Sequence, residues 1–444
     1  MKTSDSHELA SSEASFRLPA GGVDAIITAL TTENSAGPAF VYERVDPFTR
    51  EPLTTWIGIR VDERRLNNDA EQFSELRREL DGLKVEGAPG GVFAFIAHPA
   101  GRDESDSSPG ARSETPSAVF LRLVDYIYID HVAGSARVIH VGSGDPAIPA
   151  KWAEMCESAK GQPLDLSPQE AQFEWAAAIS EEEFANGVTS FQERASELGL
   201  GGVVLSVRMS SRHVSDAIMS YRVLRAINPS TCMFLLQRPG FALWGSTSLS
   251  LAEIHNRRIV AETDGATHPI PDMPNGDEYV WNPTAKEISE YDVVAEALWE
   301  DLAPISMPGT QRFTRELEQR IFFGLGHLFA EMRSVIADEH DEISVVEALA
   351  PHGAAVGHPR PAALALISEL EVVPRGPFAG VVGMFGTDGV TDACSVTRSM
   401  WTTLGGSFVH AGAKVVPASV AREEYDESVL KTLALRQSAR PLKM

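Results

Sequence analysis

Short runs of apolar residues, bounded by Gly, Pro or Ser, recur along most of the chain and predict β-strands. The loop DHVAGSA separates two of these runs at a distance that suits a hairpin with a longer connection. The runs cover residues 92–97, 119–129, 137–141, 203–207, 232–237, 241–245, 258–261, 380–385, 395–401 and 409–416.

Other segments repeat their apolar positions with the period of a helix. Ser167-Pro168 is a helix-start signal for the segment 165–199, in which a second helix is expected over 181–198. Further helices are predicted over 284–302, 312–336, 362–371 and 421–434. Because strands and helices mix without a strict strand–helix–strand alternation, the pattern favours an α+β fold over a doubly wound parallel sheet.

Two polar stretches interrupt this pattern. Residues 1–16 are Ser-rich and polar, which predicts a disordered tail, and residues 103–117 (DESDSSPGARSETPS) are expected to form an exposed loop. The remainder divides at about residue 165 into an N-terminal half, 17–165, and a C-terminal part, 166–440.

Composition narrows the class of protein. The chain has 444 residues with 62 acidic and 38 basic side chains, a formal net charge of −24, and 43% hydrophobic residues. This content is enough for a real core, while the negative charge argues against a nucleic-acid or anionic-membrane partner. Three scattered cysteines do not form a disulfide framework. With neither a leader-like apolar region nor a membrane-length apolar run, we expect a cytoplasmic globular protein.

Two pairs of carboxylates stand three residues apart in predicted helices, so each pair shares one helix face. They are Glu287 with Glu290 and Glu424 with Glu427. If the two pairs face each other, they offer the hard oxygen ligands that Mg²⁺ prefers. With 62 acidic residues in the chain, the same spacing also arises on solvated helix faces.

Three further positions are candidates for binding an anion. Arg398 lies in an apolar strand-like run, where an arginine is costly to bury without an anionic partner, although an edge-strand arginine can also reach solvent. The small residues around Gly412 would let a carboxylate approach the backbone, or simply form a tight strand. Lys431 follows Glu427 by four residues, which equally suits a helical ion pair.

Sequence signatures of nucleotide-binding and hydrolytic sites are missing from the chain: the phosphate-binding loop, the dinucleotide fingerprint, G-x-S-x-G and H-E-x-x-H. His352 and His358 bracket the stretch PHGAAVGHPR, where loop histidines are commonly ordinary polar residues.

Several blocks, in order, resemble the chorismate-utilising family of anthranilate, aminodeoxychorismate, isochorismate and salicylate synthases. The most specific is ISELEVVPRGPFAGVVGMFGTDGVTDACSVTRS, which is similar to E-L-E-x-x-P-R-G-x-Y-x-G-x-x-G followed by an arginine strand. VHAGAKVVPASVAREEYDESVLK resembles A-G-A-G-I-V followed by E-x-x-E-T and K, while KEISEY resembles K-E-x-x-E-H and TDGATH resembles I-A-G-T-R. The resemblance implies two similar halves with β-sheets packed face to face and helices outside, and it makes 166–440 the chorismate-binding catalytic part.

The resemblance also assigns roles to individual residues. It implies that the two carboxylate pairs hold Mg²⁺, directly or through water, and that the metal holds the ring carboxylate. Arg398, Gly412 and Lys431 would bind the enolpyruvyl carboxylate, and Thr267 would lie near the ring hydroxyl. A divalent ion and two cations would then reverse the negative field of the chain locally.

The chain departs from the family at the proton-transfer positions. Gly202 stands where isochorismate and salicylate synthases have a lysine that activates water, and Leu249 stands where they have the glutamate that protonates the leaving hydroxyl. A missing acid or base costs about 10²–10⁴-fold each. Other departures are His268 for an arginine, Tyr291 for a histidine, Phe323 for a histidine one turn before His327, Phe378 for a tyrosine and Lys414 for a glycine.

Three functions follow as hypotheses. The first is a Mg²⁺-dependent enzyme of secondary metabolism that runs altered chemistry on chorismate or a relative such as isochorismate. Pyruvate elimination suits it because that step depends chiefly on orientation, with His268, His327, His358 and Lys414 as catalytic candidates. The second is an ordinary isochorismate or salicylate synthase with substitute residues, and the third is a non-catalytic ligand-binding homologue. An ammonia-using synthase is not favoured because no cysteine lies in a glutaminase motif, although a separate glutaminase subunit stays open.

Overall fold

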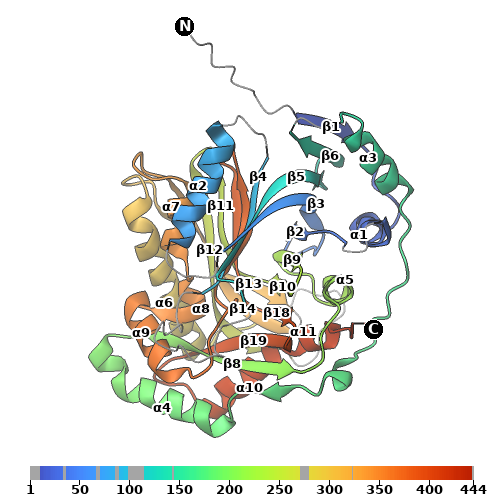
Figure 1. The fold of residues 1–444 in the computed structure, drawn as a ribbon. Helices are drawn as coiled ribbons and strands as arrows, with labels where there is room; N and C mark the ends of the chain where they lie inside the picture. The colour runs from blue at the N-terminus through green and yellow to red at the C-terminus, as the bar shows by residue number, and fades with distance from the viewer. Residues whose placement is uncertain are drawn as a thin grey trace.

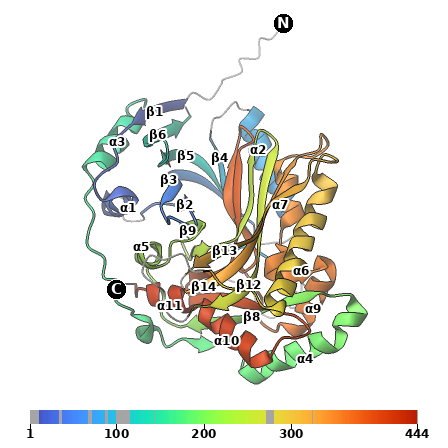
Figure 2. The ribbon, with the colours of Figure 1, turned by 180° about the vertical axis from the view of Figure 1, so that it is seen from behind.

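The computed structural model describes residues 11–33, 37–66, 71–85, 90–98, 115–142, 145–270, 280–322 and 324–442. Strands pair edge to edge into one continuous sheet that folds over itself into two layers, with helices on the outside (Figures 1 and 2). Every pairing between described strands is antiparallel. The fold is therefore the predicted α+β architecture with packed sheets.

The first layer runs from the N-terminal strand to the strands near the C-terminus. In spatial order it contains β1 (Ser11–Ser15), β6 (Ser135–Val141), β5 (Ala118–Asp130), β3 (Pro52–Leu66), β2 (Phe40–Val45), β9 (Cys232–Arg238), β10 (Phe241–Thr247), β18 (Ser399–Thr403), β19 (Gly406–Val415) and β8 (Gly202–Ser211). The short strands β7 (Ala176–Ala177) and β15 (Gly357–His358) also pair with β8.

The second layer starts from β5, whose first half pairs with β4. It continues through β4 (Gly91–Ile96), β16 (Val381–Gly386), β17 (Thr391–Ser395), β11 (Ser250–His255), β12 (Arg258–Pro269), β14 (Leu325–Val335) and β13 (Arg312–Phe322). Each layer thus combines a block of strands from each half of the chain, and the blocks meet where β2 pairs with β9 and β4 with β16.

Helices cover the outer faces of both layers. One group comprises α1 (Gly22–Glu33), α3 (Ile148–Ser158), α5 (Ala217–Ile227) and α11 (Leu433–Ser438), and the opposite group α2 (Gln72–Val85), α6 (Ala285–Leu302) and α7 (Glu342–Leu349). A third group packs beside β8 and β19: α4 (Glu181–Leu198), α8 (Gly353–Val356), α9 (Arg360–Leu370) and α10 (Ala421–Lys431). No helix in the described part of the chain combines the length and apolar character of a membrane span.

The core between the two layers is rich in aromatic residues. Phe40 of β2 stacks on Phe93 of β4 with ring centroids 4.4 Å apart, and Phe95 and Phe234 are fully buried beside them. Burying each such side chain contributes about 1.5–3 kcal/mol, so this cluster holds the two layers together.

Several predicted elements are confirmed because local signals agree with the fold. Ser180 with Glu183 and Thr284 with Glu287 form capping boxes that start α4 and α6 at the predicted positions. The predicted hairpin is β5–β6, and the helix predicted over 362–371 is α9.

The helix predicted over 312–336 is wrong, because this segment is the β13–β14 hairpin. Gly324 makes the turn with a φ of +74°, and β14 pairs with β12 along nearly its whole length. The charged residues of β13 favour a helix locally, but the long ladder that β14 forms with β12 outweighs local preference.

Four smaller predictions also need correction. Residues 11–15 form strand β1, while 1–10 of the predicted tail and 103–114 of the predicted loop lie outside the described residues. The segment 165–180 contains only a 3₁₀ turn (Glu170–Phe173) and β7, because Asp165 accepts hydrogen bonds from the backbone and hydroxyl of Ser167 and forms a turn instead. The helix predicted over 421–434 divides into α10 and α11. The strand predicted over 395–401 breaks between β17 and β18.

A buried ion pair joins the loop after α9 to strand β8. Arg375 donates to both carboxylate oxygens of Glu371 at 2.7 and 2.8 Å, and to the carbonyls of Ala355 and Val204 at 3.0 and 2.7 Å. Arg375 is 1% exposed. Because a buried carboxylate without its partner is costly, this pair locks the loop onto β8.

We predict that Arg375→Met will destabilise the fold by about 3–5 kcal/mol, since it leaves the largely buried Glu371 without its cation and with only Ser206 as a hydrogen-bond donor among the described residues. Arg422→Met is the matched control, because Arg422 pairs with Glu181 and Asp426 on the surface and such pairs contribute about 0–1 kcal/mol. Denaturant unfolding measures both. Equal effects of the two variants would contradict the structural role of Arg375.

Candidate active site

A small polar cavity lies where β8 and β19 meet β12, α6 and α10. Its volume is about 80 Å³. Acidic, basic and small residues line it together, among them Asp264, Thr267, Glu290, His327, Arg398, Gly412, Lys414, Glu427 and Lys431. The structure thus brings together, from separate parts of the sequence, most of the residues predicted to form the site.

Arg398 reaches the cavity because the chain breaks between β17 and β18. It has a φ of +45°, a conformation that non-glycine residues rarely adopt. Its guanidinium donates to Nε2 of His327 at 2.5 Å and forms no ion pair with a carboxylate of the described residues. Burial lowers the pKa of Arg398. A buried guanidinium whose only side-chain partner is a neutral ring is suited to receive an anionic ligand.

His327 is held as a neutral ring that positions Arg398. Its Nδ1 lies 2.8 Å from the carbonyl oxygen of Ala266, which can only accept, so Nδ1 carries the proton and Nε2 accepts from Arg398. Burial, followed by the charges of Arg398 and Lys431, holds the pKa of His327 well below its usual value. With both nitrogens engaged, His327 orients the arginine and is not free to carry protons.

Lys431 ties α10 to β19 at the edge of the cavity. Its ammonium donates to Glu427 Oε1 at 2.7 Å and to the carbonyl of Gly412 at 3.2 Å. Both alternatives left open for Lys431 therefore coexist in the structure: it forms the helical ion pair and also faces the cavity beside Gly412.

The predicted carboxylate quartet divides into two parts. Glu290 and Glu424 share the ammonium of Lys286, at 3.3 and 2.8 Å. Burial raises the pKa of Glu290 to about 7, with the charges of Glu427 and Glu424 adding to the rise and Lys286 opposing it. Burial alone would lower the pKa of Lys286, but its hydrogen bond to Glu424 and the neighbouring carboxylates raise it instead.

Glu287 points away from the other three carboxylates. One oxygen accepts from the backbone of Thr284 at 2.6 Å, and the other lies 2.9 Å from Nδ1 of His268. His268 stacks on Trp281 with ring centroids 5.1 Å apart. Glu287 and His268 thus cap α6 and are not among the described residues that line the cavity.

Glu290, Glu424 and Glu427 carry the hard oxygen donors that a divalent cation prefers, but the Lys286 ammonium now stands between two of them. Among the described residues, the group whose ligand atoms converge within 4.8 Å is instead Glu296, Glu300 and His358. The carboxylates of Glu290, Glu424 and Glu427 approach one another closely enough to raise the pKa of Glu290 and Glu424, beyond the effect of burial. Hard oxygen donors of this kind suit Mg²⁺. Such an ion would supply positive charge for an anionic substrate.

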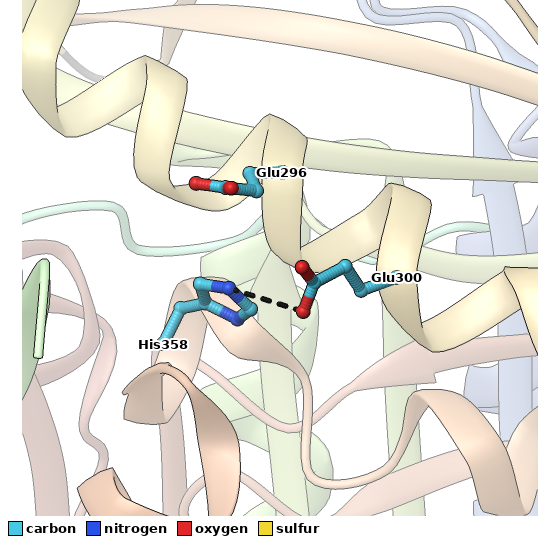
Figure 3. Close-up of side chains that lie close together, drawn as sticks. All are labelled: Glu296, Glu300 and His358. Carbon is cyan, nitrogen blue, oxygen red and sulfur yellow. Dashed lines mark ion pairs between the residues drawn. The ribbon is translucent and has the colours of Figure 1, made fainter. Parts of the chain in front are cut away.

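His358 lies in a different cluster from the cavity residues. Figure 3 shows it facing Glu300 and Glu296 of α6, with its Nε2 3.4 Å from Glu300 Oε2. The ligand atoms of these three residues lie within 4.8 Å of one another, but both glutamates are exposed. His358 is not among the described residues that line the cavity.

The two positions of the missing acid and base now have a structural description. Leu249 lines the cavity as an apolar side chain, and Glu253, four residues later, pairs with Arg44 on β2. Gly202 presents no side chain, and the stem of Lys414 from the neighbouring strand lies against it. Position 249 therefore carries no carboxylate, and position 202 carries no amine.

Sequence reasoning missed Lys286 and Asp264. Asp264 lines the cavity and accepts from the hydroxyl of Ser248 at 3.0 Å. A carboxylate between Thr263 and Gly265, in an otherwise buried strand, was the available signal for it. Lys286 carried no such signal, because a lysine four residues before a glutamate is common on helix surfaces.

Comparison with known proteins agrees with this arrangement. The family model described as chorismate binding enzyme matches residues 39–437. The chain belongs to the chorismate-binding enzyme family. Anthranilate synthase component 1 of Geobacillus stearothermophilus is 28% identical over 71% of this chain and 64% of its own length, so the chain spans somewhat under two thirds of that relative. Aminodeoxychorismate synthase component 1 of Bacillus subtilis is 27% identical over 73% of this chain and 71% of its own length.

Solved structures show the same fold. The menaquinone-specific isochorismate synthase of Escherichia coli has a TM-score of 0.71 at 16% identity, covering 97% of this chain and 95% of that one. Anthranilate synthase component I of Streptococcus pneumoniae has a TM-score of 0.68 at 20% identity, covering 90% and 92%. The predicted family and fold are confirmed.

We predict that stability will fall as the pH drops below the ordinary pKa of histidine, because the unfolded chain binds a proton at His327 that the folded protein excludes. The contribution of this residue is about 1.4 kcal/mol per pH unit below pH ~6.5. His327→Gln keeps a donor and an acceptor without titrating, so its stability should depend less on pH. Unfolding measured between pH 5 and 8 tests this, and an unchanged slope in the variant would contradict it.

Proposed function

We propose that this protein is a Mg²⁺-dependent enzyme that eliminates pyruvate from chorismate or a closely related ring acid. The observation that carries the proposal is the composition of the cavity wall. Arg398 and Lys431 line the cavity and offer cations to a carboxylate, while Glu290 and Glu427 line it and offer oxygens to a metal. Glu424 is not part of the lining, but it shares the ammonium of Lys286 with Glu290 and can offer a further oxygen. This set suits an acid with two carboxylates, one held by the cations and one by the metal.

The absence of a glutamate at position 249 supports elimination over water-for-hydroxyl exchange. Exchange needs an acid beside the departing hydroxyl, and Leu249 supplies only apolar surface there. Loss of pyruvate leaves an aromatic ring, so the reaction has a strong driving force without such an acid. Orientation of the ring by its two carboxylates then becomes the main requirement.

A ligand in this cavity would lie against the side chain of Lys414, which is part of the lining. Lys414 is the charged lining residue whose head group has no hydrogen-bond partner among the described residues, so it can move at little cost. This side chain can therefore shift to accommodate the ligand.

One alternative keeps ordinary isochorismate or salicylate synthase chemistry, and it is favoured by the amine of Lys414 inside the cavity. Two of the relatives are named component 1, which raises the question of a second subunit. This chain contains no glutaminase motif, so a glutaminase activity would have to come from such a subunit. The proposed setting is a secondary-metabolic pathway in the cytoplasm, and a ligand-binding homologue without activity is the remaining candidate.

The test is mass-resolved chromatography of the protein incubated with chorismate or isochorismate, with and without Mg²⁺. We expect pyruvate and an aromatic acid in equal amounts, and only when Mg²⁺ is present. An isochorismate product would instead support the alternative. No product with either substrate would exclude the proposed activity.

We predict that Glu424→Gln will weaken Mg²⁺-dependent ligand binding at least about tenfold, a loss typical of disturbed metal sites. Glu423→Gln is the matched control, because Glu423 is the exposed neighbour of Glu424 on the same helix. Thermal stabilisation by chorismate, titrated with Mg²⁺, measures both. Equal Mg²⁺ dependence in the two variants would exclude the metal assignment.

A further inference from the structure

Lys414 is a buried amine with no hydrogen-bond partner among the described residues. It is 7% exposed and lines the cavity. An unsatisfied buried polar group costs about 1–3 kcal/mol of folding free energy, so stability does not explain why a lysine occupies this position. A bound ligand that accepts a hydrogen bond or a proton from the amine would explain it.

The other protonatable side chains of the cavity are already engaged. His327 uses both ring nitrogens, Lys431 binds Glu427 and a carbonyl, and Asp264 accepts from Ser248. Glu290 contacts Lys286. Among the described lining residues, Lys414 is therefore the basic group that is free to exchange a proton with a ligand.

The absence of a side chain at Gly202 makes room for Lys414. On β8 and β19, Lys414 stands opposite Val204, two residues from Gly202 on the same face of the strand. A Cβ at Gly202 would lie 3.6 Å from Lys414 Cγ and 3.2 Å from the carbonyl oxygen of Val415. The Cβ would thus make an ordinary contact with the lysine stem, and only the atoms beyond Cβ in a larger side chain would compete with the stem for space.

We propose that Lys414 is the base of the elimination, taking a proton from the ring carbon next to the one that bears the enolpyruvyl ether. The C–H electron pair becomes the new ring double bond as the ether C–O bond breaks, and its electron pair leaves on the enolpyruvate oxygen. The lysine ammonium returns its proton to the enolate, which becomes pyruvate. Substrate is thus converted to aromatic acid and pyruvate without a further reactant. This inference rests on the function proposed above.

The surroundings of Lys414 suit this role. Burial lowers its pKa to about 8, with Lys431 adding to the effect and the charges of Glu290 and Asp264 opposing it. A base with a pKa near the working pH both accepts and returns a proton readily. Because no hydrogen bond holds the amine in place, it can move from the ring carbon to the leaving group while it carries the proton.

The experiment compares Lys414→Arg and Lys414→Met with the wild type. Arginine keeps the positive charge but does not lose its proton, and methionine keeps the length of the stem. We expect pyruvate release to fall at least about 100-fold in both variants, with chorismate affinity in Lys414→Arg within tenfold of the wild type. Lys151→Met is the control for loss of an exposed lysine, since Lys151 is 73% exposed on its side chain.

Chemical rescue separates a base from a structural residue. In Lys414→Ala, added ethylamine should restore part of the pyruvate release, and amines of different basicity should do so in proportion to that basicity. Near-wild-type turnover in Lys414→Arg would show that only the charge matters and would overturn the inference. Failure of every amine to rescue Lys414→Ala would likewise count against it.

Two controls keep the outcomes distinct. A wild-type protein that releases no pyruvate overturns the proposed function and this step with it, whereas active wild type with active Lys414→Arg overturns the step alone. If the Lys414 variants do not fold, Gly202→Val becomes the test, because it leaves the lysine in the chain while its two methyl groups compete with the lysine stem for space. Unchanged turnover in Gly202→Val would then overturn the inference.

Discussion

The cost of removing charged groups from water governs the arrangement around the cavity. Arg398, Lys414, Glu290 and Glu424 are all buried, and an isolated buried charge is too costly to persist unless it is paired or changes its protonation. Lys286 therefore bridges two glutamates, and the pKa of Glu290 rises. Among the described residues, Arg398 has only a neutral histidine side chain as hydrogen-bond partner, and Lys414 has none. An anionic ligand would pair with these two cations.

Small residues bring these charges together. A Cβ at Gly265 would lie 2.7 Å from Cα of Tyr291, so only glycine lets α6 approach β12 this closely. A Cβ at Gly412 would lie 2.7 Å from the carbonyl oxygen of Leu205. The contact of α6 with β12 carries Glu290 to the cavity, and the tight pairing of β19 with β8 carries Lys414 to Gly202.

Local signals explain which parts of the fold the sequence predicts. Helices α4 and α6 have capping boxes and a clear apolar face, and both were predicted within a residue of their ends. The hairpin β13–β14 was predicted as a helix because its charged residues suit a helix surface and because the residues that pair with it in β12 lie 56 to 77 positions earlier in the chain. Pairing with a distant strand leaves no local trace in the sequence.

The site shows the same division between local and distant information. The residue types determined the chemistry: paired carboxylates, an arginine in an apolar run and a lysine after a glutamate identified Glu290, Glu424, Arg398 and Lys431 as candidates. The sequence by itself also indicated the family, through several blocks that occur in the family's order.

Only the tertiary structure decided which candidates meet. It turned Glu287 toward Thr284 and His268, placed His358 beside Glu300, held His327 as a neutral ring against Arg398 and left the stem of Lys414 beside Gly202. These outcomes depend on rotamers and on the register of strands far apart in the chain. Such distances, and the desolvation they impose, are set by packing, which no local pattern of residues encodes.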